Sequence, residues 1–180
     1  MNACFKIYGV LAVPALIIPR ASRRFDQGMR MLQATAANED ALALENQFCF
    51  ALYSTSLAMT KTYKVLLDKV GLTYPQYLVM LVLWKKDDVL VKDIGELLLL
   101  DSGTLTPLLK RLEVLGFLTR TRDQQDERQV RIALTSEGKQ LKRRATGIPS
   151  QVVCASGKSA RALAELRAQL LEVRRDLLQL

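Results

Sequence analysis

The chain has 180 residues and a formal net charge of +8, with 26 Lys and Arg residues against 18 Asp and Glu residues. This length favours a single domain, and the basic excess favours a polyanionic partner such as nucleic acid. The sequence contains no histidine, which excludes Ser-His-Asp and Cys-His catalysis and every histidine-based metal site. We therefore expect no catalytic residues, no metal and no cofactor.

Residues 7–18 form an apolar stretch that superficially resembles a secretory signal. Pro14 and Pro19 interrupt the stretch, no small-residue cleavage site follows it, and it is too short to cross a bilayer. We expect residues 1–38 to be a poorly ordered or spurious leader in which Cys4 has no function. Residues 39–180 are then expected to be the folded part of a cytoplasmic protein with no membrane partner.

The three cysteines, Cys4, Cys49 and Cys154, are widely spaced and form no CxxC pair. An odd, scattered set does not make a secreted disulfide framework, so the cysteines indicate a reducing compartment. Each thiol is either individually reactive or simply a small buried apolar side chain, and for an isolated free cysteine burial is the commoner role.

A long helix is predicted from about residue 40 to residue 70, with Asn38 or Asp40 as its N-cap and Gly71 as its stop. Apolar residues recur along this helix at helical intervals and predict a core-facing stripe: Phe48, Leu52, Met59, Tyr63, Leu66 and Val70.

Cys49 and Tyr63 lie fourteen residues apart on this predicted helix, which is about 21 Å along its axis at ~1.5 Å per residue. They cannot meet within one chain. If both belong to one site, the helix must run antiparallel to its copy across a two-fold axis. A shared site would therefore imply a homodimer.

The next helix begins with Thr73 as its cap, Pro75 in its first turn and Gln76 completing a capping box. Residues 77–84 are then eight apolar residues in succession. A run of this length is typical of a buried central helix and is too short for a membrane span.

Residues 91–98 carry apolar residues at helical spacing, and a polar break at residues 101–103 precedes another helix that ends at Gly116. Five leucines form the apolar stripe of that helix: Leu105, Leu108, Leu109, Leu112 and Leu115. A proline inside a helix costs about 3 kcal/mol, so we place Thr104 at the N-cap and Pro107 in the first turn. Two helices this close together indicate a helix-turn-helix.

The second helix of this pair has the features of a DNA-reading helix. The hydroxyls at its start are expected to face the groove, because helix N-termini and hydroxyls also bind phosphates: Ser102, Thr104 and Thr106. Lys110 and Arg111 lie off its apolar stripe. Ten basic residues against five acidic ones occupy the stretch from Lys110 to Arg144: Lys110, Arg111, Arg120, Arg122, Arg128, Arg131, Lys139, Lys142, Arg143 and Arg144. We expect Lys110, Arg111 and Arg122 to contact DNA, although a solvated face is the plainer explanation for any single one.

After Gly116 the hydrophobic period changes from that of a helix to that of a strand. Residues 117–121 and 129–134 alternate, and residues 122–128 between them are wholly charged or amide. This pattern predicts a β-hairpin with a long polar tip, which is the form of a wing.

Here the chain resembles the MarR family of winged-helix regulators, whose wing carries an Asp-x-Arg motif, present as Asp126-Glu127-Arg128. The resemblance implies a mainly α fold with a small β-hairpin wing, in which residues 72–135 form the winged helix-turn-helix. It also implies that two recognition helices enter successive major grooves of double-stranded operator DNA, an inverted repeat, ~34 Å apart. Arg128, oriented by Asp126, would reach toward a minor groove.

Two or three further helices are predicted beyond the wing. Thr135 caps a basic helix, which residues 147–149 should bend or interrupt just before Cys154. The last helix, residues 159–180, has apolar residues spaced 3-4-3-4 like a coiled-coil seam: Leu163, Leu166, Leu170, Val173 and Leu177. The seam packs either against the chain's own first helix or, as the family resemblance implies, against the partner subunit. In the second case residues 39–71 and 136–180 are the dimerisation helices.

The sequence around Cys49, Glu45-Asn46-Gln47-Phe48-Cys49-Phe50-Ala51-Leu52-Tyr53-Ser54, looks like that of the organic hydroperoxide resistance regulators, the OhrR branch of the family. In that branch the sensing cysteine sits near the start of the first helix. The resemblance implies that Tyr63 and Tyr74 hydrogen-bond the sulfur of Cys49, and that Cys154 is the resolving cysteine.

The same resemblance implies a mechanism. The reduced homodimer binds its operator, and an organic or lipid hydroperoxide oxidises the thiolate of Cys49 to a sulfenic acid. Cys154 of the partner subunit then captures the sulfenic acid as a disulfide, and the repressor leaves the DNA.

Two other functions are compatible with the sequence. One is a MarR-type regulator that senses a small aromatic ligand without redox chemistry. The other is a thiol peroxidase that uses Cys49 and Cys154. The basic reading helix and the wing have no purpose in such an enzyme, so we expect a regulator and not an enzyme.

Overall fold

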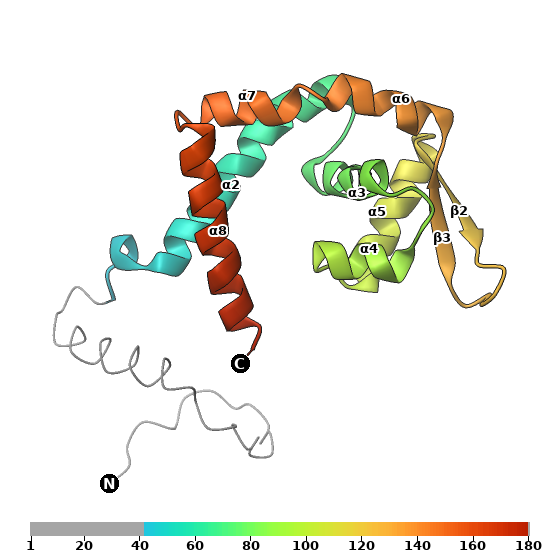
Figure 1. The fold of residues 1–180 in the computed structure, drawn as a ribbon, viewed down its shortest axis with the longest axis horizontal. Coiled ribbons are helices and arrows are strands. Elements are labelled where there is room, and N and C mark those ends of the chain that lie inside the picture. Colours follow the sequence, from blue (N-terminus) through green and yellow to red (C-terminus); the bar gives the residue numbers. More distant parts are fainter. Residues whose placement is uncertain (1–41, 180) are drawn as a thin grey trace, which may run out of the picture. The chain divides into compact units, whose positions relative to one another are not determined.

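The computed structural model describes residues 42–179. The predicted leader, Cys4 and the two candidate caps Asn38 and Asp40 lie outside these residues. The chain divides into two units, one up to Leu52 and one from Tyr53 onward, and Figure 1 shows the order of their elements. Within the described residues the first unit holds a short 3-10 helix, Leu44–Asn46, and the start of helix α2.

Helix α2 comprises Phe48–Leu67 and is followed by a 3-10 turn, Asp68–Val70, that ends at Gly71 in the left-handed region. The predicted stop is therefore confirmed, but the predicted start near residue 40 is wrong. The backbone is extended at Ala43 and again at Gln47, so no helix can run continuously through them. The later start places Cys49 in the first turn of α2.

Helices α3 (Tyr74–Lys85), α4 (Val91–Leu98) and α5 (Ser102–Val114) surround the core of the second unit. The start of α3 follows the prediction: the Gln76 side chain accepts hydrogen bonds from the backbone N–H and the hydroxyl of Thr73, at 2.8 and 3.0 Å. Side chains from these three helices, from the sheet and from the end of α2 are fully buried: Leu67, Val79, Met80, Leu83, Ile94, Leu105, Leu109, Leu112, Leu118 and Ile132. The helix-turn-helix is thus held on one continuous apolar core.

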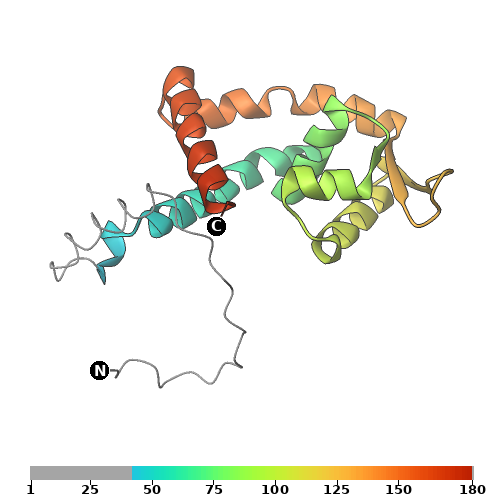
Figure 2. The same cartoon turned by 60° about the horizontal axis from the view of Figure 1, so that its bottom comes forward.

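The predicted hairpin is present as β2 (Leu118–Arg122) and β3 (Val130–Leu134), antiparallel, with Arg120 opposite Ile132. A third strand, β1 (Val89–Leu90), pairs with the other edge of β3, so the strand order is β1-β3-β2. A strand of two residues has no alternation that a sequence could reveal. The hairpin projects from the helices in both views (Figures 1 and 2), and the mainly helical fold with a wing is confirmed.

The start of α5 differs from the prediction. Asp101, not Thr104, is the N-cap, and its carboxylate accepts from the backbone N–H of Thr104 at 2.8 Å. Pro107 consequently lies inside the helix, and the carboxylate cap helps to offset the backbone hydrogen bond that proline removes. The predicted apolar stripe also ends one residue early, because Leu115 is exposed.

Three helices follow the wing: α6 (Ser136–Ala145), α7 (Ile148–Ala155) and α8 (Ala160–Leu177). Thr135 caps α6 as predicted, and Ser159 caps α8. None of the helices in residues 42–179 is both long and apolar enough to span a membrane.

Large apolar side chains remain exposed on α2 and α8. On α2 they include Phe48, Leu52, Tyr53, Leu57, Met59 and Val65, and on α8 Leu166, Leu171 and Leu177. The predicted core-facing stripe of the first helix is therefore only partly correct. Tyr63 and Leu66 pack against the core and Val70 is buried within it, whereas Phe48, Leu52 and Met59 are exposed.

Candidate nucleic-acid interface and thiol site

The first turn of α5 presents the hydroxyl groups that were predicted to meet DNA. Ser102 and Thr104 are exposed and Thr106 is half-buried. The Thr104 hydroxyl donates to the other oxygen of Asp101 at 2.9 Å. The hydrogen bonds from Thr104 lower the pKa of the Asp101 carboxyl, so Asp101 is ionised at neutral pH. Asp101 therefore positions the residues of this turn.

Four predicted DNA-binding cations are exposed and form no side-chain ion pair with any residue in the described part of the chain: Lys110, Arg111, Arg122 and Arg128. Lys110 and Arg111 lie on α5, on the face away from the buried Leu109 and Leu112. Arg122 ends β2, and Arg128 lies in the wing tip. These side chains are available to bind phosphate.

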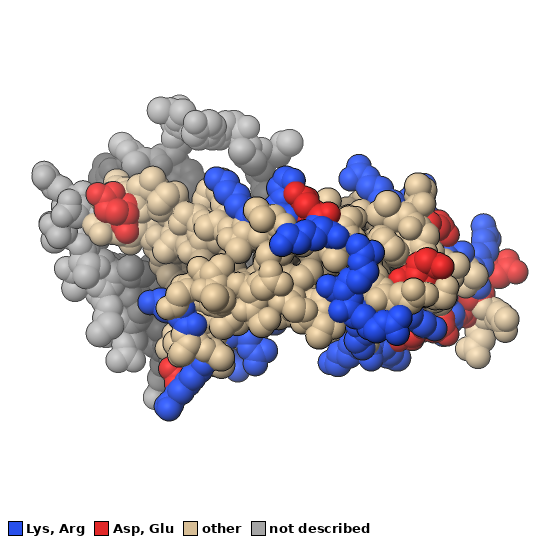
Figure 3. Space-filling model, turned by 90° about the horizontal axis from the view of Figure 1, so that it is seen from above, with Lys and Arg blue, Asp and Glu red and all other residues tan. Residues whose placement is uncertain are grey.

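Most of the other basic residues of this region are engaged in contacts of their own. Arg120 pairs with Glu113 at 3.7 Å, and Lys139 on α6 pairs with Asp87 at 3.1 Å. Lys142 and Arg144 donate to backbone carbonyls. Figure 3 shows Lys and Arg side chains gathered on one face, over α6. A count of basic residues from the sequence therefore overstates the charge that is free to bind DNA.

Asp126 of the Asp-x-Arg motif acts on Arg128 through the backbone. One carboxylate oxygen accepts from the Arg128 backbone N–H at 3.0 Å, and the other accepts from the Gln129 side-chain amide at 2.9 Å. These hydrogen bonds, that from Gln129 first, lower the pKa of the Asp126 carboxyl. No ion pair joins the two side chains among the contacts of the described residues. The carboxylate shapes the loop and leaves the guanidinium free.

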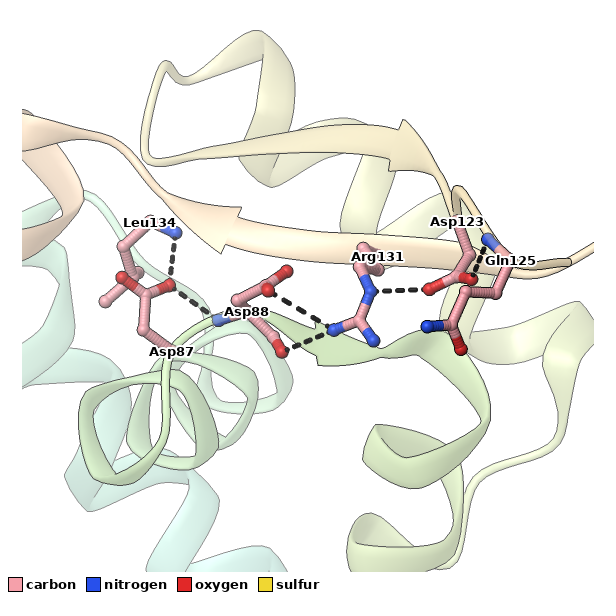
Figure 4. A network of polar contacts seen from close by, with 6 residues as sticks. All are labelled: Asp87, Asp88, Asp123, Gln125, Arg131 and Leu134. Carbon is pink, nitrogen blue, oxygen red and sulfur yellow. Dashed lines mark hydrogen bonds and ion pairs between the residues drawn. The ribbon is translucent and has the colours of Figure 1, made fainter. Parts of the chain in front are cut away.

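Asp123 is a wing residue that the sequence did not single out. The residue is buried, with an exposed fraction of 8%. Its carboxylate accepts from the Gln125 backbone N–H and from Arg131 (Figure 4), and also from the backbone N–H of Asp126. In the sequence it is one acid in a run of polar residues. Its partners Gln125 and Asp126 follow at the spacing of an Asx-turn, which is the only local signal that could have identified it.

Tyr63 and Tyr74, the predicted sulfur ligands, lie together. Their ring centroids are 4.6 Å apart, and Tyr77 adds a third ring 5.8 Å from Tyr63. Burial, and then the neighbouring tyrosines, raise the pKa of Tyr63. The sequence placed Tyr77 only in an apolar run, although Tyr74 and Tyr77 are one helical turn apart on α3 and so share a face.

Cys49 and Cys154 are both exposed free thiols. Cys49 lies in the first turn of α2 and Cys154 in the last turn of α7. Cys49 is therefore exposed and is not part of the core that the described residues form. Its place near the N-terminus of a helix of 20 residues puts it close to the positive end of the helix dipole.

Comparison with known proteins agrees with this architecture. Residues 61–145 match the family described as the SarA/Rot transcriptional regulators. The chain is 51% identical over 131 residues to the organic hydroperoxide resistance transcriptional regulator of Bacillus subtilis, covering 73% of this chain and 89% of that protein. It is also similar to a structure of reduced AbfR bound to DNA, with a TM-score of 0.65 and 33% identity over 83% of this chain and 99% of that one.

A structure of AbfR in its disulfide form aligns with a TM-score of 0.53 and 33% identity, over 85% of this chain and 97% of that one. Fold, wing and relatives together define a MarR-type winged-helix transcriptional regulator. Within that class the chain belongs to the family of organic hydroperoxide resistance regulators.

Proposed function

We propose that the chain is a cytoplasmic, homodimeric repressor that binds an inverted-repeat operator when reduced and releases it when an organic or lipid hydroperoxide oxidises Cys49. In this proposal residues 72–135 bind DNA, residues 39–71 and 136–180 form the dimer, and the protein is neither an enzyme nor dependent on a cofactor. The main support for the proposal is the contact between the rings of Tyr63 and Tyr74. The second support is that Cys49 is an exposed free thiol at the start of a helix.

Binding to DNA is supported by the free cations on α5 and the wing, and by the relative AbfR, of which a structure of the reduced protein bound to DNA is known. Lys110 and Arg111 would contact phosphates beside the major groove, with Ser102, Thr104 and Thr106 at the start of the reading helix. Arg122 and Arg128 would follow the backbone into the adjacent minor groove.

Dimerisation is supported by the exposed apolar side chains of α2 and α8. Large apolar side chains gathered along two helices mark a surface that another protein covers. A second copy of this chain is the partner that could also bring tyrosine side chains close to Cys49. Cys49 and Tyr63 are fourteen residues apart on α2, about 21 Å at ~1.5 Å per residue, so only the partner's tyrosines could reach the sulfur.

The redox step follows from ordinary thiol chemistry. The Cys49 thiolate attacks one oxygen of the hydroperoxide, the O–O bond breaks, and the sulfenic acid and an alcohol are formed. The thiol of Cys154 from the partner subunit then attacks that sulfur, and water leaves as the disulfide forms. A disulfide form is known for the relative AbfR. In this chain the loss of the thiolate would release the tyrosine hydroxyls and reorient α2.

A second candidate function has one observation in its favour. An open, largely apolar pocket of about 310 Å³ lies between α3 and the end of α6, lined by Tyr77, Leu81 and Trp84 with Lys85 and Lys142 beside them. Such a pocket suits a small aromatic anion. A regulator of that kind would respond to the ligand without Cys49. A thiol peroxidase, by contrast, would turn over repeatedly with a reductant.

A gel-shift with operator DNA, with and without cumene hydroperoxide, tests the proposal. We expect the peroxide to abolish the shift for the wild-type protein, with one oxidation per subunit and a Cys49–Cys154 disulfide in the peptide map. Cys49→Ser should bind DNA and ignore the peroxide. Release of Cys49→Ser by an aromatic acid would support the ligand-sensing function instead, and sustained peroxide consumption would support the enzyme.

A further inference from the structure

One guanidinium, that of Arg131, connects the wing with the corner that follows α3. Arg131 lies on β3, and its Nε donates to the carboxylate of Asp123 at the start of the wing tip. Its Nη1 donates to the carboxylate and the backbone carbonyl of Asp88, at 3.2 and 3.1 Å (Figure 4). Asp88 precedes β1 and holds a left-handed backbone, with φ of 55°. Arg131 therefore spans two loops that are far apart in the sequence.

Asp123 links Arg131 to the backbone of the wing tip through hydrogen bonds. While one oxygen accepts from Arg131, the other accepts from the backbone N–H groups of Gln125 and Asp126, at 2.8 and 3.1 Å. The hydrogen bonds from Gln125 and then from Arg131 lower the pKa of the Asp123 carboxyl. The first turn of the tip is thus closed around a carboxylate that Arg131 anchors to the body of the domain.

The same hydrogen bonds continue to the DNA-facing arginine. Asp126, held by Asp123 through its N–H, accepts from the backbone N–H of Arg128. A continuous series therefore runs from Arg131 through Asp123 and Asp126 to the backbone of Arg128. The tip also has backbone hydrogen bonds of its own, from the Asp123 N–H to the Gln129 carbonyl at 2.9 Å and from the Gln129 N–H to the Asp126 carbonyl at 2.8 Å. The series from Arg131 adds a link to the body of the domain, and each anchored turn reduces the conformational freedom of a long polar loop.

We propose that Arg131 is a positioning residue for DNA binding, which holds the wing tip in one arrangement relative to the domain so that Arg128 is placed for the minor groove before DNA arrives. This inference rests on the proposed function of the wing. A loop that is ordered in advance loses less entropy when it binds, and so binds more tightly with the same contacts.

A direct contact between Arg131 and phosphate is the competing explanation. Arg131 is half-buried and sits between two carboxylates, Asp88 and Asp123, so its own surroundings carry more negative than positive charge. Arg122, on the neighbouring strand, is exposed and has no carboxylate partner among the ion pairs of residues 42–179. Arg122 is therefore the matched control for a direct phosphate contact.

The experiment uses the full-length protein and a DNA duplex selected by the wild-type protein from a random pool. Affinities are measured for Arg131→Met, Arg131→Lys and Arg122→Met, each with and without Arg128→Ala. We expect Arg131→Met to weaken binding roughly five- to tenfold, and Arg131→Lys to weaken it similarly because one ammonium cannot bridge both carboxylates. In the Arg128→Ala background, Arg131→Met should add little, whereas Arg122→Met should add its full effect.

Rescue by Arg131→Lys, or full additivity with Arg128→Ala, would overturn the proposal, since a phosphate contact needs only a positive charge. Amide hydrogen exchange without DNA gives an independent readout. Arg131→Met should speed exchange at Gln125, Asp126 and Arg128 and leave Ile132 protected, and unchanged exchange at the tip would also overturn the proposal.

If Arg131→Met fails to fold, Asp123→Asn is used in its place, because the amide oxygen retains the turn but weakens the contact to Arg131. If the wild-type protein selects no duplex, the proposed function fails while the exchange measurement still tests the anchor.

Discussion

The rings of Tyr63 and Tyr74 pack against each other, with centroids 4.6 Å apart and planes tilted by 39°. Tyr63 comes from α2 and Tyr74 begins α3, so the turn at Gly71 brings them together. Burial raises the pKa of Tyr63, which keeps its phenol protonated and able to donate a hydrogen bond at neutral pH. A thiolate accepts such a bond better than a thiol does.

We predict that the double variant Tyr63→Phe, Tyr74→Phe reacts at least about tenfold more slowly at Cys49 with cumene hydroperoxide, because it loses two hydrogen bonds to a charged group and one such bond alone accounts for about tenfold. The rings and their packing remain, so folding and reduced-state dimerisation should change little. The measurement is the oxidation rate by stopped-flow, with Tyr77→Phe as a control from the same cluster. Equal rates for the parent and the double variant would make the tyrosines core residues only.

Operator affinity should fall steeply with salt, because several Lys and Arg side chains displace condensed counterions when they bind phosphates. Binding is measured between roughly 50 and 200 mM salt. Lys110→Ala should make the log–log slope shallower by about one unit, whereas Lys139→Ala should not, since Lys139 is paired with Asp87. A flat response in the wild-type protein would contradict binding through α5 and the wing.

Arg128→Ala should weaken operator binding by about 1–3 kcal/mol without unfolding the protein. The side chain is exposed, and Asp126 holds the backbone of the loop rather than the guanidinium. Fluorescence anisotropy gives the affinity and a thermal melt checks the fold. Glu127→Ala, its exposed neighbour, is the control. An unchanged affinity in Arg128→Ala would mean that the Asp-x-Arg motif of this chain does not contribute to DNA binding.

Asp87 should make stability depend on acid pH. Although burial acts to raise its pKa, hydrogen bonds from the Leu134 N–H, Lys139 and the Asp88 N–H lower it below the ordinary value of 3.8. A carboxyl whose pKa is lowered by folding stabilises the protein above its unfolded pKa, and this contribution is lost as pH falls through the folded pKa.

Accordingly, Asp87→Asn should be about 1 kcal/mol less stable at pH 7, since water screens a carboxylate that is 35% exposed. Urea unfolding at several pH values measures this. The gap between the variant and the wild-type protein should shrink as the pH drops below about 4. A constant gap across that range would show that the charge of Asp87 does not contribute.

The exposed seam of α8 should be necessary for the proposed dimer. Leu166→Glu places a charge on the apolar side of the helix and should dissociate the dimer, because burying an unpaired charge costs several kcal/mol. Ala168→Glu, on the opposite side of α8, is the matched control. Light scattering gives the mass of each variant. A dimeric Leu166→Glu protein would place the interface elsewhere.

Much of the fold could be predicted because its signals are local. Helical spacing located α4 and α5, the Thr73 capping box located the start of α3, and the change to strand alternation located the hairpin. The predictions were wrong or incomplete where contacts with residues outside the local pattern decide the structure. Strand β1 exists because β3 offers it an open edge, and Asp101 rather than Thr104 caps α5 because its carboxylate accepts two hydrogen bonds from Thr104.

Some features of the candidate site could likewise be predicted from the sequence, and others could not. The sequence by itself determined the family, through the spacing around Cys49 and the Asp-x-Arg motif, since motif residues keep fixed distances along the chain. Only the tertiary structure decided that Tyr63 stacks on Tyr74, and that Arg131 joins Asp88 to Asp123. Those contacts depend on how separate elements pack, because a side chain meets whichever partner the core brings within a few ångströms, and Arg131 and Asp88 are 43 residues apart along the chain.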